Sequence, residues 1–119
     1  SIVLVSSAAA RLGLPNHEAI AAAKAGVIGL TLSAAASYAG YGIRVNCVAP
    51  GLVKTPLTQR ITGNENLLRA STAMHPLQRI GEPADVVSAM AWLADPRNGW
   101  ITGQTLGVDG GLGSVRSRH

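Results

Sequence analysis

Aromatic side chains are scarce in this sequence, at 3% of its 119 residues, and phenylalanine is absent. Charged residues make up only 13%, whereas hydrophobic residues, many of them alanine, make up 47%. This balance excludes a disordered chain and predicts a large buried surface, or surfaces buried against partners. The length suits one small core, so we expect a single domain over residues 1–119.

Cysteine and histidine are too few and too dispersed for a local metal motif. The sequence has one cysteine, Cys47, and three histidines, His17, His75 and His119. A single cysteine excludes an intramolecular disulfide and a cysteine-based metal site. Cys47 lies in the β-like run IRVNCVAP, where we expect a small buried apolar residue.

The formal net charge of +4 comes from basic residues that are scattered along the chain. Nucleic-acid binding requires basic residues gathered on one face or interleaved with aromatics. The only local cluster is Arg116 with Arg118, so we expect no nucleic-acid partner. No apolar run reaches membrane-spanning length and no signal-peptide layout is seen, so we expect no membrane partner and a cytoplasmic location.

Short apolar runs alternate with helix-like segments. The sequence predicts strands over 1–7, 43–51 and 104–108, helices over 16–39 and 82–95, and one or two short helices around 57–61 and 64–73. Strands that alternate with helices favour parallel pairing through right-handed crossovers. We therefore expect an α/β fold with three parallel strands and helices on both faces of the sheet.

The longest predicted helix, 16–39, carries small residues on nearly every face. Asn16 is a favourable N-cap residue, and Glu18 in the first turn complements the helix dipole. Alanine, Gly26 and Gly29 leave no polar stripe along it. We expect this helix to be buried on several sides.

Four blocks in a fixed order carry a resemblance to a known enzyme family. They are IVLVSSAAA, AAAKAGVIGLT, GIRVNCVAPGLVKTP and ITGQTLGVDGG, and they span essentially the whole chain. Together they resemble the C-terminal half of the short-chain dehydrogenase/reductase family. The resemblance implies a partial Rossmann-like, doubly wound sheet. It also implies an NAD(P)-dependent oxidoreductase that acts on a carbonyl or an alcohol, with NAD or NADP as cofactor.

The family's N-terminal half supplies a glycine-rich phosphate-binding turn, which these 119 residues lack. Dinucleotide phosphates need the backbone N–H groups of such a turn. The glycines at 107–113 follow the last predicted strand with no helix behind them, so we interpret them as a terminal turn. We expect the chain to correspond to strands five to seven of the family fold. A natural short gene, a proteolytic fragment and an engineered piece all stay open.

In the family, a serine, a tyrosine and a lysine carry catalysis, and the lysine also holds the nicotinamide ribose. Ser7 and Lys24 match the serine and the lysine in spacing, but Ile20 stands at the tyrosine position. Ile20 and Lys24 share one helix face. An alkyl side chain cannot exchange a proton with an alkoxide, and general acid–base catalysis is worth about 10²–10⁴-fold. We therefore expect this chain to be inactive on its own.

Two residues have alternative interpretations. Ser7 is either the family's carbonyl-polarising serine or a strand-end hydroxyl that bonds a backbone group. His17 has a side chain suited to proton transfer. Helix rise nevertheless puts it about 10 Å from Lys24 along the axis, so we interpret His17 as a surface residue at the helix N-terminus.

The segment PGLVKTP resembles the family's nicotinamide-binding loop. The resemblance implies that Pro50 and Gly51 line the site. It also implies that Val53 contacts the carboxamide through its backbone, and that Thr55 bonds the carboxamide or a phosphate. Residues 57–74 correspond to the family's variable substrate lid, so the substrate stays open, as does the choice between NAD and NADP.

Without strands one to four, the 1–7 strand would have an unpaired apolar edge, which is an aggregation template unless it is covered. We therefore expect a homo-oligomer that covers this edge and packs the 16–39 helices together. Two function classes stay open. One is an oxidoreductase or part of one, and the other is a non-catalytic oligomerising fragment or pseudoenzyme.

Overall fold

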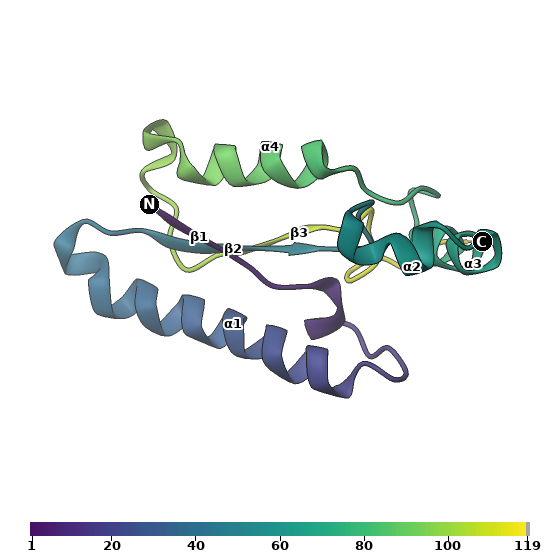
Figure 1. Ribbon diagram of the computed structural model, residues 1–119. Coiled ribbons are helices and arrows are strands. Elements are labelled where there is room, and N and C mark those ends of the chain that lie inside the picture. Colours follow the sequence, from purple (N-terminus) through teal and green to yellow (C-terminus); the bar gives the residue numbers. More distant parts are fainter. Residues whose placement is uncertain (119) are drawn as a thin grey trace.

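Three parallel strands lie between layers of helices in the computed structural model, which describes residues 1–118 (Figure 1). The strands are β1 (Ile2–Val5), β2 (Val45–Pro50) and β3 (Thr105–Val108), in the spatial order β1-β2-β3. One face of the sheet is covered by α1 (Glu18–Tyr38) and the other by α4 (Pro83–Ala94). The predicted α/β fold, a partial Rossmann-like sheet with helices on both faces, is confirmed.

Shorter helices occupy the connections between these elements. They are η1 (Ala8–Ala10), η2 (Ala39–Tyr41), η3 (Pro56–Thr58), α2 (Gln59–Thr62), α3 (Glu65–Met74) and η4 (Pro96–Asn98). The short helices predicted around 57–61 and 64–73 are thereby confirmed. Both α2 and α3 lie beyond the carboxyl end of β2, at one end of the molecule (Figure 1).

The central strand β2 forms the core. Its residues from Val45 to Ala49 are each exposed by 1% or less. Such burial arises because β2 pairs with a strand on each side and has a helix over each face. Cys47 is fully buried there, as its sequence context predicts.

A buried amide fastens β2 to the segment that leads into β3. Asn46 is fully buried; its Nδ2 donates to the Ile101 carbonyl and its Oδ1 accepts from the Gln104 N–H, both at 3.0 Å. Beside it, the Val45 N–H donates to the Thr102 hydroxyl at 3.1 Å. A polar side chain is stable in this core because its polar atoms are bonded.

The start of α1 differs from the prediction. His17, rather than Asn16, is the N-cap residue, and it makes no side-chain capping bond. Asn16 instead has a φ of 62°, in the left-handed region that asparagine tolerates better than most residues. The asparagine therefore turns the chain into the helix and does not cap it.

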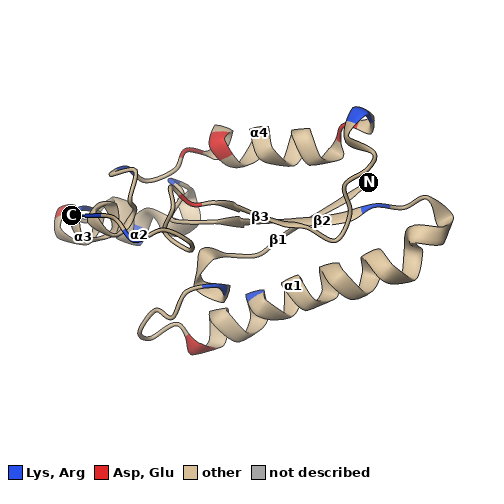
Figure 2. Cartoon of the chain, turned by 180° about the vertical axis from the view of Figure 1, so that it is seen from behind, with Lys and Arg blue, Asp and Glu red and all other residues tan. Residues whose placement is uncertain are grey.

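The expectation that α1 is buried on several sides is wrong for the single chain. Only Thr31 and Ala35 are buried, while Leu30 and Leu32 are more than half exposed. Charged residues on α1 lie only toward its N-terminal end (Figure 2). The outer side of α1 is therefore largely apolar, because the helix covers one sheet face and nothing in the described chain covers the helix (Figure 1).

By length and composition, the helical stretch Glu18–Tyr41 is apolar enough to cross a membrane. The expectation that no segment reaches that length is therefore wrong. Inspection of uninterrupted apolar runs missed it, because glycine, serine and threonine break the run without making it strongly polar. The match is weak evidence for a membrane, since core helices and signal sequences pass the same test.

Candidate active site

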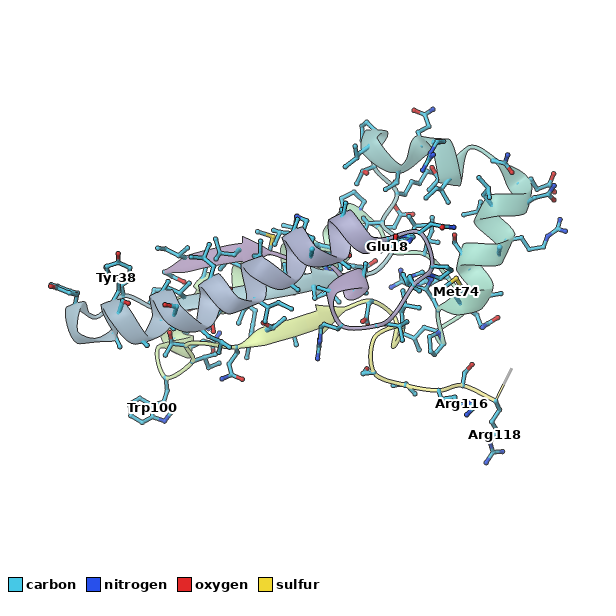
Figure 3. All side chains as sticks on the ribbon, turned by 90° about the horizontal axis from the view of Figure 1, so that it is seen from below. Glu18, Tyr38, Met74, Trp100, Arg116 and Arg118 are labelled. Carbon is cyan, nitrogen blue, oxygen red and sulfur yellow. The ribbon has the colours of Figure 1, made fainter. Side chains whose placement is uncertain are left out.

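The predicted site residues come from the carboxyl ends of two neighbouring strands and from α1. Ser7 follows β1 closely, Gly51 follows β2 directly, and Lys24 lies in the second turn of α1. In open α/β sheets, ligands bind outside the carboxyl ends of the strands. The first turn of α1, at Glu18, and the last residue of α3, Met74, lie at this same end of the molecule (Figure 3).

Ser7 caps a short helix. Its Oγ accepts a hydrogen bond from the Ala9 N–H at 3.1 Å, at the start of η1. This is the strand-end role that was one of its two interpretations. A hydroxyl can donate one hydrogen bond while it accepts others. Capping therefore leaves Ser7 able to donate to a carbonyl oxygen.

Lys24 is fastened to the end of β1 by two hydrogen bonds in opposite directions. Its Nζ donates to the Val5 carbonyl at 3.1 Å. The hydroxyl of Ser6, a buried residue, donates to the Lys24 carbonyl at 2.7 Å. An ammonium group has three donors, so two remain for a ligand. Ser6 was not singled out from the sequence, although it stands next to Ser7 in the block IVLVSSAAA.

The position that the resemblance assigns to the family's tyrosine offers no group for proton transfer. Ile20 is 46% exposed and lies one turn before Lys24 on the same helix face. His17 is exposed at the start of α1, and its Nδ1 lies 2.8 Å from the Pro15 carbonyl oxygen. Within residues 1–118, no hydrogen bond joins His17 to Ser7 or to Lys24.

The loop after β2 is held by a neighbouring backbone segment. Gly81 brackets Val53: its N–H donates to the Leu52 carbonyl at 2.8 Å, and its carbonyl accepts from the Lys54 N–H at 2.9 Å. These bonds extend the parallel pairing beyond the sheet. These two bonds restrain the backbone of the loop at the strand ends.

Val53 presents a free backbone donor. Its carbonyl accepts a hydrogen bond from the Thr58 hydroxyl, but its N–H donates to no residue in the described part of the chain. Thr55 and Thr58 form a capping box at the start of η3, so the Thr55 hydroxyl is already engaged locally. Val53 is half-buried, and a backbone N–H without a partner in the described residues is able to donate to a ligand carbonyl oxygen.

Gly51 is a position of close packing. A Cβ at this residue would lie 2.6 Å from His75 Nε2 and 3.1 Å from Asp109 Cα. Its N–H donates to the Val108 carbonyl at 3.1 Å. Only glycine allows the His75 ring to come this close to the backbone of residue 51. The group that requires glycine here is therefore a protein side chain.

That neighbour, His75, is a residue that sequence reasoning missed. It is 3% exposed; its Nε2 accepts from the Leu52 N–H at 3.1 Å, and its Nδ1 lies 2.6 Å from the Ser71 carbonyl. These partners assign a neutral imidazole with its proton on Nδ1. A lone histidine between a helix and a proline carries no pattern that would have revealed this.

An open pocket of about 380 Å³ adjoins His75, and an ion pair lines it. Arg79 donates to both carboxylate oxygens of Asp85, at 2.9 and 3.0 Å. The pKa of Asp85 is lowered from 3.8 to about 2, mainly by these bonds from Arg79 and next by the hydrogen bond from the Glu82 N–H. Asp85 is therefore a paired carboxylate at neutral pH and does not replace the missing proton donor. Residues 1–118 hold no cluster of histidine, cysteine and acidic residues that suits a metal.

Comparisons with known proteins identify the relatives of this chain. The family model described as Enoyl-(Acyl carrier protein) reductase matches residues 1–113. The chain is 43% identical over 112 residues to 3-oxoacyl-[acyl-carrier-protein] reductase FabG of Thermotoga maritima, a match that covers 94% of this chain and 45% of the relative.

Two solved structures with bound cofactor are similar to the chain. The structure "ElxO with NADP Bound" matches with a TM-score of 0.88 and 38% identity, over 96% of this chain and 46% of that one. The structure of 4-hydroxyisoleucine dehydrogenase complexed with NADH matches with a TM-score of 0.91 and 31% identity, over 97% and 47%. The chain spans about half the length of the relatives it matches. Sequence blocks, sheet topology and these matches agree: the chain belongs to the short-chain dehydrogenase/reductase family of oxidoreductases.

Proposed function

We propose that the chain carries the nicotinamide-binding part of an NAD(P)-dependent oxidoreductase site that lacks its proton donor. The free N–H of Val53 carries this proposal, because it lies in a loop whose conformation is set by Gly81 and by Thr58. The similar structures with bound NADP and NADH support a nicotinamide cofactor.

The residues of the loop and of α1 fit one end of such a cofactor. Pro50 and Gly51 would line the nicotinamide, and the Val53 N–H would donate to its carboxamide oxygen. The free donors of Lys24 would bond the ribose hydroxyls. Thr55 is less available than the resemblance implies, because its hydroxyl caps η3. When bound, the cofactor supplies or accepts a hydride.

The chain's own residues can polarise a substrate carbonyl but cannot supply a proton to it. Ser7 keeps a donor for a substrate carbonyl oxygen, so it can polarise that group. Ile20 supplies no proton to the oxygen that hydride transfer leaves negatively charged. Loss of general acid–base catalysis lowers a rate by about 10²–10⁴-fold. Weak or absent turnover with retained nicotinamide binding is the expected combination.

Titration of the ¹⁵N-labelled 119-residue chain with NADH tests this function. The amide signal of Val53 is expected to shift saturably and more than that of exposed Gly29, which lies in the middle of α1 and serves as the internal control. A panel of ketones with NADH is expected to give no turnover above background. Absence of any saturable shift up to millimolar NADH would instead favour the second class, a non-catalytic oligomerising fragment or pseudoenzyme.

We also propose that the chain is a homo-oligomer that covers the edge of β1 and packs copies of α1 together. Strand β1 lies at the edge of the sheet, and Ile2 and Val5 are 45% and 39% exposed on it. The apolar outer side of α1 adds a second uncovered surface. Light scattering at micromolar concentration is expected to give a mass above one chain. A monomer under these conditions would contradict the proposal. The Val5→Lys variant should form smaller species than the wild type, because a charge on an edge strand opposes pairing with another strand.

A further inference from the structure

One side chain joins α3, which belongs to the segment that corresponds to the family's substrate lid, to the loop after β2. His75 is the C-cap residue of α3, and its ring reaches the Leu52 N–H of the loop. The backbone of His75 is itself fixed: its N–H donates to the Thr72 carbonyl at 3.2 Å, and its carbonyl accepts from the Gln78 N–H at 2.8 Å. The ring therefore extends from a backbone position that is held by two hydrogen bonds.

Both ring nitrogens of His75 are used, one toward each element. Nδ1 donates to the Ser71 carbonyl in the last turn of α3, and Nε2 accepts from Leu52. The ring is nearly fully buried, and the absent side chain of Gly51 leaves the space that Nε2 occupies. A displacement of the last turn of α3 must therefore move Nε2 or break its bond to Leu52. Since Leu52 precedes Val53, a displacement that keeps this bond acts on the backbone directly before the free Val53 N–H.

We propose that His75 is a positioning residue that couples α3 to the loop 51–53. The functional meaning of the coupling rests on the proposed function, in which this loop binds the nicotinamide. The lid helix and the cofactor loop then move as one unit: ordering of α3 orders the Leu52 and Val53 amides, and occupation of the loop orders α3.

The first experiment uses NMR on the 119-residue chain without cofactor. Ring ¹⁵N shifts of wild-type His75 are expected to report a proton on Nδ1; a proton on Nε2 would overturn the proposal. His75→Gln offers an amide oxygen to Leu52 and an amide N–H to Ser71, whereas His75→Phe offers neither. Exchange of the Leu52 amide is expected to accelerate about tenfold in His75→Phe and to stay within about threefold of wild type in His75→Gln. Equal rates in the two variants count against the proposal, and if His75→Phe does not fold, the tautomer and the His75→Gln rate still decide.

The second experiment separates coupling from simple packing. Asn64 caps the far end of α3 by accepting from the Asn66 and Leu67 N–H groups at 3.0 and 3.1 Å. Asn64→Ala should fray α3 and raise the Leu52 exchange rate in the wild-type background, but not further in His75→Phe. Equal effects in both backgrounds would show that His75 does not transmit motion of α3.

A third measurement links the coupling to the cofactor. Where NADH binds, His75→Phe is expected to weaken binding about tenfold and His75→Gln to restore it; unchanged affinity in His75→Phe overturns the functional part. Where the wild type does not bind NADH, the proposed function fails, while the exchange rates of Leu52 still decide whether α3 and the loop are coupled. The two failures are thus told apart.

Discussion

The loop after β2 and the helix after β1 carry two parts of one family site, yet the fold holds them very differently. The loop continues a strand whose residues Val45–Ala49 are almost completely buried, and Gly81, His75 and Thr58 each bond to it. Only two residues of α1 are buried. The part that we propose to bind the nicotinamide is therefore built on the core, and the part that matches the family's catalytic residues lies at the margin of the core.

This difference explains how a proton donor can be absent without harm to the fold. Ile20 is nearly half exposed, and it belongs to a helix that touches the sheet along one side only. A residue at such a position contributes less to packing than a core residue, so we expect a substitution there to cost little stability. In the loop after β2, by contrast, a single added methyl group at Gly51 would meet protein atoms.

The largest expected effect is in the core beneath the loop. Asn46→Ala removes both hydrogen bonds of the buried amide and leaves the Ile101 carbonyl and Gln104 N–H without these partners. The free energy of unfolding should fall by about 2–4 kcal/mol, measured by urea denaturation. Gln104→Ala, whose amide makes one exposed bond, is the control and should change it by about 0.5 kcal/mol or less. Similar values for the two variants would contradict the assignment of Asn46 to the core.

One substitution made in both regions sharpens the comparison directly. Gly51→Ala places a Cβ against His75 and Asp109 and should cost about 1–3 kcal/mol of unfolding free energy. Gly29→Ala on α1 meets nothing within 4 Å and removes a helix-interior glycine, so it should stabilise by about 0.5–1 kcal/mol. Both values come from urea unfolding curves. Effects of the same sign would mean that the two regions do not differ as the structure shows.

A smaller effect on stability is expected at the missing proton donor. Ile20→Tyr should alter the unfolding free energy by about 0.5 kcal/mol or less, because the position is half exposed. We expect no recovery of ketone reduction with NADH in the 119-residue chain, since these residues contain no glycine-rich phosphate-binding turn. Absorbance of NADH at steady state measures the rate. Turnover in the single variant would contradict the importance of that turn.

The smallest effect is expected at the exposed ion pair between Arg79 and Asp85, at the start of α4. Bonds from Arg79 lower the pKa of Asp85 from 3.8 to about 2, so the pair favours the folded state while Asp85 is ionised in it. This contribution is complete above 3.8 and is lost as the pH falls through about 2. The difference in urea midpoint between wild type and Arg79→Gln should therefore shrink across that window. In an Asp85→Asn background the difference should not depend on pH.

Much of the fold follows from local sequence signals. Pro50 with Gly51 ends the strand before the loop, Pro83 opens α4, and the β-branched runs mark strands. The predicted N-cap of α1 was wrong by one residue, because Asn16 takes a left-handed conformation that competes with capping and His17 is the N-cap residue. The predicted burial of α1 was wrong. A helix without a polar stripe indicates that its surface is to be packed against something, but it does not indicate whether the same chain supplies the packing.

The sequence by itself determined the family blocks and the chemical deficit at Ile20, because the identity of a side chain does not depend on how the chain folds. Only the tertiary structure decided that Ser7 caps η1, that Thr55 is engaged with Thr58, and that His75 holds Leu52. Each hydrogen bond depends on which atoms the parallel strands bring within reach. For His75 and Leu52, 23 positions apart, no local pattern carries that information.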